Sequence, residues 1–354
     1  MTREELYKPF LADLLATRTP SGYEDEARAV LEKYLKPVAS EWEGDLLGNR
    51  FARIGKPGGL HVMVSGHMDE IGFIVSYIHN RGFLHFDTLG GHDVPLIAGR
   101  PVMIMGSFGP VRGVIGKKAI HLQAPNERKK LPEVHELWID IGAETEAEAR
   151  QLVREGDPAT YDCGFGWLLG TRAHARGFDN KIGTYVANEV LRRLAPGYDG
   201  PRLTALSTAM EEVGTRGMIP SIEREAPDVA IVVEVGHATE MPDSDFRRTG
   251  AFELGKGPIL TRGPNVHPGV FRRLIETAEE RKIPFQIKAE SKPAGNDARS
   301  AQIGAKGVAT AVVAVPLRYM HTATEVVEMK DVEASIQLIK GFVETCRRDE
   351  SFIY

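Results

Sequence analysis

The sequence predicts an α/β protein, with a mixed sheet flanked by helices and a small β-rich segment inserted into it. Apolar runs alternate with helical patterns near both ends of the 354-residue chain, as is typical of strands that are buried on both faces of a sheet. Short β runs separated by glycine and proline fill the stretch between them. Because the two flanks share one pattern, we expect them to form a single domain around the insertion.

The first flank is predicted to contain a helix and a strand. Ser21-Gly22-Tyr23-Glu24 matches a capping box, whose serine and glutamate side chains satisfy backbone N–H groups at a helix start. The apolar residues that follow recur at helical spacing: Ala27, Val30, Leu31, Tyr34 and Leu35. A strand is expected over residues 60–65, directly before Gly66 and His67.

The inserted segment is predicted to be a small β-barrel or sandwich. Its β runs cover residues 71–75, 82–86, 101–105 and 111–115. The polar and basic stretch at 119–136 is expected to form a loop. We therefore predict a domain made of residues 1–70 and 162–354, and a β-rich domain over residues 71–161.

The second flank is predicted to alternate strands and helices. Strands are expected over residues 203–208, 229–235 and 307–315, and helical patterns cover 181–194, 270–278 and 332–346. This alternation completes the α/β prediction.

The bulk composition excludes several classes of protein. The formal charge of -5 is small and both signs are scattered, which gives no indication of nucleic-acid or membrane-surface binding. Cys163 and Cys346 form no Cys-x-x-Cys, so neither a thiolate zinc site nor a disulfide framework is expected. The first residues lack the apolar stretch of a signal peptide. We therefore expect a cytoplasmic protein with no nucleic-acid or membrane partner.

Five short motifs rich in carboxylates and histidines carry the functional prediction. Four end or follow predicted strands, and the one with Asp179 opens a predicted helix. They are Gly66-His67-Met68-Asp69-Glu70, Phe178-Asp179-Asn180-Lys181, Met210-Glu211-Glu212-Val213-Gly214, Val233-Glu234-Val235 and Tyr319-Met320-His321. Ligands of open α/β sheets bind at the carboxyl ends of the strands. Histidines and carboxylates gathered there suit two neighbouring divalent cations, and the sequence therefore predicts a metal-dependent hydrolase.

The motifs suggest distinct roles for their residues. His67 offers one ring nitrogen to a metal, and Asp69 can accept the proton of the other nitrogen and fix the tautomer. Neighbouring residues that leave a strand point in opposite directions, so one of Glu211 and Glu212 is expected to bind metal and the other to act as general base. Glu234 interrupts an apolar strand, where a metal, a basic side chain or exposure at the strand end must compensate its charge.

The surroundings of the site are also predicted. His92 and His237 are expected to lie beside the site without binding a metal. Residues 236–265 and 288–300, the latter with Gly295-Asn296-Asp297, are expected to form walls of the substrate pocket.

Together the motifs resemble the TET-type (tetrahedral) co-catalytic metalloaminopeptidases, metallopeptidase family forty-two. That family includes glutamyl, leucyl, lysyl and deblocking aminopeptidases and some members labelled endoglucanase. The matching segments run in order along almost the whole chain: Ser65-Gly66-His67-Met68-Asp69-Glu70-Ile71-Gly72, Gly90-Gly91-His92-Asp93, Val114-Ile115-Gly116, Asp140-Ile141-Gly142-Ala143, Phe178-Asp179-Asn180-Lys181-Ile182-Gly183, Glu211-Glu212-Val213-Gly214, Gly255-Lys256-Gly257-Pro258 and Pro316-Leu317-Arg318-Tyr319-Met320-His321. Each segment alone is a weak signal, whereas their order and spacing are specific.

The resemblance implies two divalent metal ions per subunit, zinc or cobalt, with manganese as a further candidate. The implied ligands are His67, Asp179, Glu212, Glu234 and His321. Asp179 would bridge the ions, His67 and Glu234 would complete one site, and the remaining two residues would complete the other. Glu211 would be the general base, and Asp69 would orient His67.

The resemblance also implies an architecture and an assembly. The catalytic domain would be zinc-peptidase-like, and the insertion would be a PDZ-like dimerisation domain. Dimers would assemble into a hollow tetrahedral homododecamer that admits peptides. Two positions depart from the family pattern: Glu234 stands where Asp is usual, and Asn180-Lys181 stands where Arg is common after the bridging carboxylate.

The implied function is an aminopeptidase that removes N-terminal residues from short peptides. One alternative is a two-metal hydrolase that acts on a carbohydrate or an N-acyl amide. A second alternative is a non-catalytic, shell-forming protein whose metal site has decayed through Glu234.

Overall fold

The computed structural model describes residues 1–292 and 295–353, and within them an eleven-stranded sheet forms the larger part of the molecule. Nine strands follow the order β1-β2-β12-β3-β13-β16-β17-β11-β10, and β14 pairs with β15 and β16. The strands are β1 (Glu41–Gly44), β2 (Arg50–Ile54), β3 (His61–His67), β10 (Gly166–Trp167), β11 (Arg172–Ala175), β12 (Arg202–Thr208), β13 (Val229–His237), β14 (Ile259–Arg262), β15 (Gln286–Ala289), β16 (Ala309–Arg318) and β17 (Glu325–Glu328).

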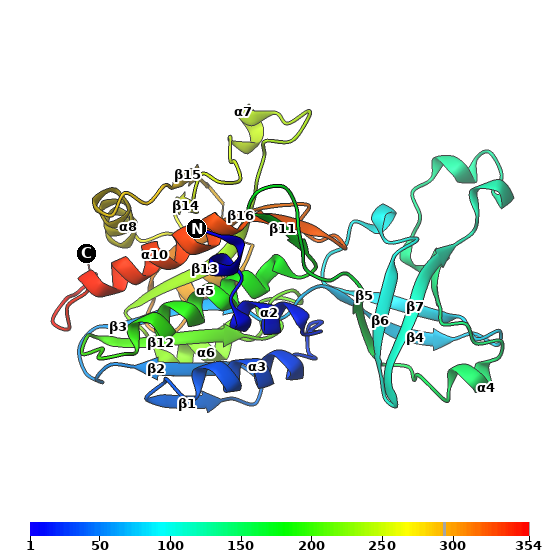
Figure 1. Ribbon diagram of the computed structural model, residues 1–354, viewed down its shortest axis with the longest axis horizontal. Coiled ribbons are helices and arrows are strands. Elements are labelled where there is room, and N and C mark those ends of the chain that lie inside the picture. The colour runs from blue at the N-terminus through cyan, green and yellow to red at the C-terminus, as the bar shows by residue number, and fades with distance from the viewer. Residues whose placement is uncertain (293–294, 354) are drawn as a thin grey trace.

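Helices cover both faces of this sheet (Figure 1). Those on the face with the larger core are α2 (Pro9–Ala16), α3 (Asp25–Leu35), α5 (Phe178–Leu194), α8 (Pro268–Glu280) and α10 (Met329–Thr345). α6 (Met218–Glu225) and α9 (Asp297–Ile303) pack on the opposite face. The alternation along β13 matches the two layers, since Ile231 and Val233 join the first core and Val232 joins the second.

Three shorter helices complete the chain: α1 (Arg3–Leu6), α4 (Glu146–Ala149) and α7 (Phe246–Thr249). α7 lies on a loop that projects from the sheet region in Figure 1. In the ranges that the structure describes, every helix is too short or too polar to cross a membrane.

Four neighbouring strands in the middle of the sheet run parallel. β3 is parallel to β12 and to β13, and β13 is parallel to β16. Most residues of β13 and β16 are buried, because helices cover both faces of these strands. The carboxyl ends of the four strands therefore meet at one edge of the sheet.

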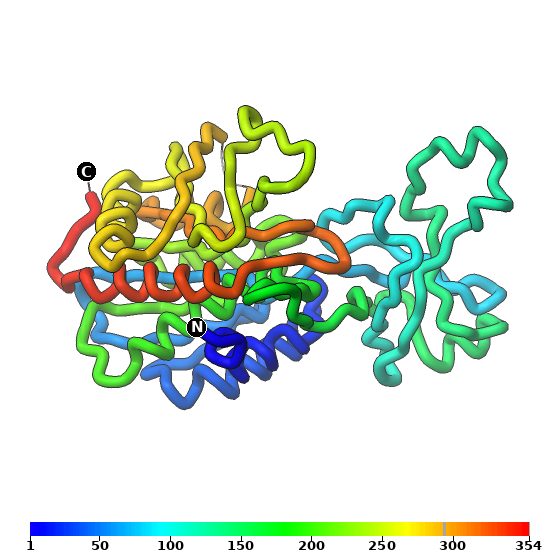
Figure 2. Tube along the Cα trace, turned by 45° about the horizontal axis from the view of Figure 1, so that its top comes forward, coloured from blue at the N-terminus to red at the C-terminus, as the bar shows by residue number. Residues whose placement is uncertain are grey.

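The inserted β runs form a closed antiparallel barrel in the order β4-β5-β8-β7-β6-β9, which confirms the predicted fold class. Its strands are β4 (Gly72–Ile78), β5 (Leu84–Leu89), β6 (Pro101–Gly106), β7 (Gly109–Lys117), β8 (Leu137–Asp140) and β9 (Pro158–Tyr161). The barrel has a core of its own and lies at one end of the molecule, apart from the main sheet, in both Figure 1 and Figure 2. Residues 119–136 form an exposed loop with short 3-10 turns.

The predicted capping box is wrong. α3 begins at Asp25, and neither Ser21 nor Glu24 caps it through its side chain. Instead, Ser21 Oγ donates to Asp69 Oδ2 at 2.5 Å, and Glu24 accepts N–H groups of Gly22 and Met210. The fold brings buried partners to both side chains, and these partners replace the local cap.

Two glycines allow α5 to pack directly on the sheet. A Cβ on Gly66 would overlap the backbone of Gly183, and a Cβ on Gly183 would lie 2.5 Å from the carbonyl oxygen of Val233. Only residues without a side chain permit so close an approach of backbones. The start of α5 therefore lies against β3 and β13, which places Asp179 beside His67.

Candidate active site and metal centre

The five motifs meet around one cavity of about 880 Å³ at the carboxyl edge of the parallel strands. β3 ends at His67, Glu234 lies near the end of β13, and His321 follows β16. Glu211 and Glu212 follow β12, so four motifs come from four adjacent strands. The predicted residues that line the cavity are His67, Asp179, Glu211, Glu212, Glu234 and His321.

Asp179 presents its two carboxylate oxygens to two histidines. Its Oδ1 lies 3.2 Å from His67 Nε2, and its Oδ2 lies 3.4 Å from His321 Nε2. His67 Nε2 is also 3.9 Å from Glu234 Oε2, and His321 Nε2 is 3.4 Å from Glu212 Oε2. Each histidine thus has a glutamate of its own, and Asp179 is common to both groups. The predicted helix start differs in detail, because Asp179 and Asn180 have non-helical backbone angles.

The donor atoms fit divalent cations. Glu212 Oε1 and Glu234 Oε1 are buried and have no hydrogen-bond partner among the residues that the structure describes. Such oxygens are costly to bury unless a ligand or a metal satisfies them. Imidazole nitrogens with carboxylate oxygens are a ligand set that zinc, cobalt and manganese accept.

The sequence left open what compensates the charge of Glu234 within an apolar strand. Its side chain is only 5% exposed, and no lysine or arginine of the described chain pairs with it. Asn180 Nδ2 donates to its Oε2 at 3.1 Å. Burial, opposed by His67 and assisted by Glu211 and Asp179, raises the pKa of Glu234 well above its usual value. Neither exposure nor a lysine or arginine of the described chain compensates the charge of Glu234, and its position beside His67 and Asp179 fits a metal ion.

The charges of the two histidines and of Asp179 depend on one another. Hydrogen bonds to Asp179 and Glu212 raise the pKa of His321 to about 11. Burial opposes ionisation of Asp179, but the hydrogen bonds from His321 and His67 lower its pKa below the usual range. A bound cation would take the place of these protons, because histidine binds metals through an unprotonated nitrogen.

Glu211 lies beside the two histidine–carboxylate groups that share Asp179, and its Oε2 is 3.9 Å from His67 Nε2. Burial raises the pKa of Glu211 to about 8, opposed by His67 and assisted by Asp297, Glu212 and Asp69. A general base works best when its pKa lies near the operating pH. Its position beside His67 suits proton transfer at this site.

Asp69 does more than the sequence indicates. Its Oδ1 lies 3.4 Å from His67 Nδ1, although its own backbone carbonyl is closer to that nitrogen, at 3.1 Å. The carboxylate also accepts the backbone N–H groups of Glu211 and Glu212 at 3.1 and 3.2 Å, and the hydroxyl of Ser21. One buried aspartate thus positions both the first histidine and the turn that carries the two glutamates.

Sequence reasoning missed two buried positioning residues. Glu325 accepts the N–H of Asp179 at 3.0 Å and the N–H of His321 at 3.2 Å. Asn180 bonds to Val233 O as well as to Glu234. The signal for Glu325 was present, since it opens an apolar run just as Glu234 interrupts one, whereas nothing local distinguishes Asn180.

A buried ion cluster lies behind the site and consists of Glu70, Arg176 and Lys181, here called the Glu70 cluster. Lys181 Nζ donates to Glu70 Oε1 at 2.8 Å and to Thr17 O at 2.7 Å, and Arg176 bonds to the same two residues. Burial opposes ionisation of Glu70, but Arg176 and Lys181 lower its pKa to about 2. The cluster ties the segment after His67 to the segment around Asp179.

Some of the residues predicted to surround the site line the cavity, and others do not. His237 lines the cavity, whereas His92 bonds to Gly72 O and Tyr161 at the barrel and is absent from the cavity lining. Segments 236–265 and 288–300 both supply walls, and residues 293 and 294 of the second lie outside the described residues. Asp297 is buried beneath this wall and accepts a hydrogen bond from Thr208 at 2.6 Å.

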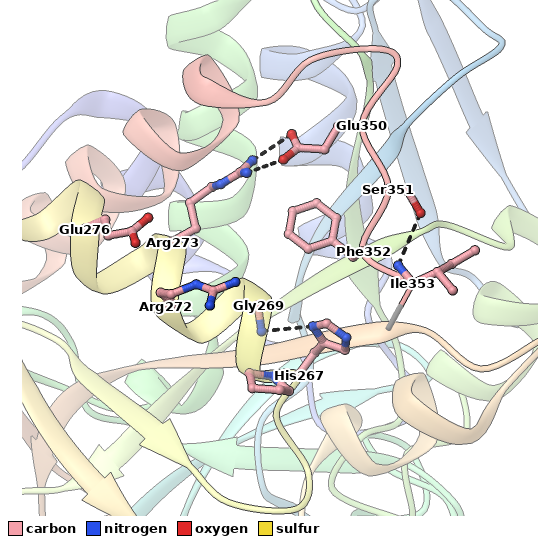
Figure 3. A pocket seen from close by; sticks show the side chains of 10 residues that line it. His267, Gly269, Arg272, Arg273, Glu276, Glu350, Ser351, Phe352 and Ile353 are labelled. Atoms are coloured by element: carbon pink, nitrogen blue, oxygen red, sulfur yellow. Dashed lines mark hydrogen bonds and ion pairs between the residues drawn. The ribbon is translucent and has the colours of Figure 1, made fainter.

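A second cavity, of about 500 Å³, lies between the start of α8 and residues 350–353 (Figure 3). Arg273 points to Glu350 there, and His267 accepts the N–H of Gly269 at 3.2 Å. None of the five motifs lines this cavity.

Comparisons with known proteins agree with the geometry. Residues 48–338 match the model of the M42 glutamyl aminopeptidase family. The lysyl aminopeptidase of Pyrococcus furiosus is 32% identical over 328 residues, covering 92% of this chain and 93% of that protein. The TET aminopeptidase of Thaumarchaeota archaeon SCGC AB-539-E09 superimposes with a TM-score of 0.91 at 32% identity, covering 96% of each chain. The TET1 peptidase of Pyrococcus horikoshii, described as forming a tetrahedron or a large octahedral shell, has a TM-score of 0.84 at 28% identity, covering 94% of this chain and 98% of that one. The chain belongs to the M42 glutamyl aminopeptidase family of peptidases.

Proposed function

We propose that the protein is a two-metal aminopeptidase that removes N-terminal residues from short peptides. The observation that carries the proposal is the position of Asp179 between His67 and His321, with one carboxylate oxygen toward each. A single shared carboxylate with a separate histidine and glutamate on each side supplies ligands for two adjacent cations.

Asp179, His67 and Glu234 would hold one cation, and Asp179, Glu212 and His321 would hold the other. Zinc, cobalt and manganese all suit these ligands. When bound, the cations supply Lewis-acid polarisation of the scissile carbonyl and make the attacking water more acidic.

Glu211 acts as the general base. It takes a proton from the attacking water and delivers it to the amine that leaves when the peptide bond breaks. Asp69 holds the backbone of Glu211 and the ring of His67, so the base keeps a fixed position relative to the cations.

The assembly is proposed on the likeness to relatives. Residues 71–161 would form the dimerisation domain, next to a catalytic domain of residues 1–70 and 162–354. Dimers would build a tetrahedral dodecamer in the cytoplasm. The related TET1 peptidase of Pyrococcus horikoshii is described as able to assemble into a tetrahedron or a large octahedral shell. Light scattering of the purified chain tests this, and a monomer at working concentration would contradict it.

The Glu211→Gln variant tests the mechanism. Chelated protein is re-supplied with zinc, cobalt or manganese and assayed on a panel of aminoacyl-p-nitroanilides. We expect the variant to lose turnover and to retain its metal, whereas loss of metal would count against the role of Glu211 as base. Activity on cellulose that survives chelation would favour a glycosidase, which needs only two carboxylates. Absence of turnover in metal-loaded wild-type protein would favour a non-catalytic role.

A further inference from the structure

One side wall of the cavity extends away from the two histidine–carboxylate groups. It is formed by one face of β13, β16, β14 and β15. Glu234 lies beside Ala314, and Ala314 lies beside Ile259. Residues opposite one another in adjacent strands point to the same face, and so do residues two apart along a strand. Thr261 and its neighbour Lys288 therefore share this face.

The part of this wall nearest Glu234 is apolar. Phe252, Ile259 and Ala314 pack as a small buried cluster, and all three line the cavity together with Val312. An aliphatic side chain placed against them would leave water for an apolar surface. The wall thus offers a side-chain pocket beside the residues that would bind the substrate's reacting end.

The far part of the wall carries two opposite charges. Lys288 Nζ lies 3.0 Å from Glu290 Oε1, and both residues line the cavity. Within the described chain neither residue has another ion-pair partner. Three strand spacings, about 14 Å, separate the backbone of β13 from that of β15. The pair therefore stands on the same wall as the apolar cluster, farther from Glu234.

We infer that the Lys288–Glu290 pair determines substrate selectivity and directs the enzyme toward peptides with an uncharged, aliphatic N-terminal residue. This inference rests on the proposed aminopeptidase function. Lys288 alone would attract an acidic side chain, and Glu290 alone would attract a basic one. Paired, each cancels the field of the other, and a charged substrate side chain would lose hydration without gaining a partner.

Outside the five motifs, two other ionisable residues of the described chain line the cavity, His237 and Arg248. Burial and the neighbouring Lys288, opposed by Asp179, lower the pKa of His237, which favours its uncharged form. Arg248 on α7 also lines the cavity and is exposed, so solvent and salt screen its charge.

Reciprocal variants test the inference through kcat/KM on leucyl-, glutamyl- and lysyl-p-nitroanilide with metal-loaded protein. We expect the wild type to prefer the leucyl substrate. Glu290→Gln should raise the glutamyl-to-leucyl ratio, and Lys288→Met should raise the lysyl-to-leucyl ratio, each on the order of tenfold. The exchange Lys288→Glu with Glu290→Lys restores the pair and should return both ratios to wild-type values.

The matched control is Lys306→Met, because Lys306 pairs with Asp228 at 3.1 Å outside the cavity. It should leave every ratio unchanged. Ratios that stay fixed in both pocket variants, or that move in the same direction, would overturn the inference. A metal-loaded wild type that cleaves none of the three substrates would instead overturn the proposed function, so the two failures are distinct. Melting temperatures verify that the half-exposed pair can be broken without unfolding the chain.

Discussion

The Glu70 cluster depends on a single carboxylate. Glu70 Oε1 accepts hydrogen bonds from Arg176, Lys181 and the N–H of Thr19. The Lys181 side chain is 0% exposed and that of Glu70 is 2% exposed. Glu70→Gln would leave two buried cations without their anionic partner. We therefore expect this substitution to be among the most destabilising polar changes in the catalytic part of the chain.

The size of the effect follows from burial. Removing one partner of a buried ion pair costs about 3 to 5 kcal/mol. At about 2.1 cal/mol/K per residue, the unfolding entropy of a 354-residue chain is roughly 0.7 kcal/mol/K. The melting temperature should therefore fall by about 4 to 7 °C.

Scanning calorimetry of the metal-loaded protein at neutral pH measures this shift. The control is Glu127→Gln, whose carboxylate pairs with Lys118 at 2.9 Å with both side chains exposed, and it should move the melting temperature by about 1 °C or less. Adding Lys181→Met to Glu70→Gln removes one of the stranded cations and should recover part of the loss. Equal melting temperatures for Glu70→Gln and the control would refute the reasoning.

Four further outcomes are expected. The pKa of Glu70 is about 2 in the folded protein, against roughly 4.3 in the unfolded chain. The ionised carboxylate therefore stabilises the fold fully above pH ~4.3, and this stabilisation is lost as the pH falls toward 2. The melting temperatures of the wild type and Glu70→Gln should converge in acid, and a constant difference between them would contradict this. Glu325→Gln should weaken zinc binding about tenfold or more in titration calorimetry, because the amide keeps only one of the two oxygens that accept the N–H groups of Asp179 and His321, and unchanged affinity would exclude that role. Gly183→Ala places a Cβ against Val233 O and should lower the free energy of unfolding in urea by about 1 to 3 kcal/mol. An unchanged free energy of unfolding would show that α5 can shift. Chelation should lower the melting temperature, and added zinc should raise it with concentration, unless the site binds no metal.

The strands that carry the site could be predicted because their signal is local. Apolar runs at 60–65, 203–208, 229–235 and 307–315 correspond to β3, β12, β13 and β16. Burial on both faces demands such runs, and polar residues at their ends stand out against them. β8 and β9 were not predicted, because four-residue strands are defined by their partners in the barrel and not by their own pattern.

The residues that support the candidate ligands through hydrogen bonds were harder to predict, because their signal is not local. Ser21 and Glu24 have a perfect local spacing for a cap, yet both bond to residues far along the chain. A tertiary partner that is already buried outweighs a cap worth about 1 kcal/mol. Local motifs therefore identify the candidate ligands, while the supporting hydrogen bonds depend on contacts that only the fold defines.

The charges of the site bear on how many cations it holds. Asp69, Asp179, Glu211, Glu212 and Glu234 lie in or against the cavity, and Asp297 and Glu325 are buried next to them. Each divalent cation would offset two negative charges, so two cations compensate more of this acidic group than one does. The Glu70 cluster behind the site carries one net positive charge and adds to that compensation.

Two cations thus bring the buried region closer to neutrality than one, which favours the burial of so many carboxylates. We expect metal analysis of the loaded wild type to give two ions per chain. Glu234→Ala removes one negative charge and one ligand from the group with His67, so the second ion should bind more weakly in titration calorimetry while the ion beside His321 is retained. A single ion in the wild type, or two ions bound with unchanged affinity in Glu234→Ala, would mean that Glu234 is compensated by protonation and not by a metal.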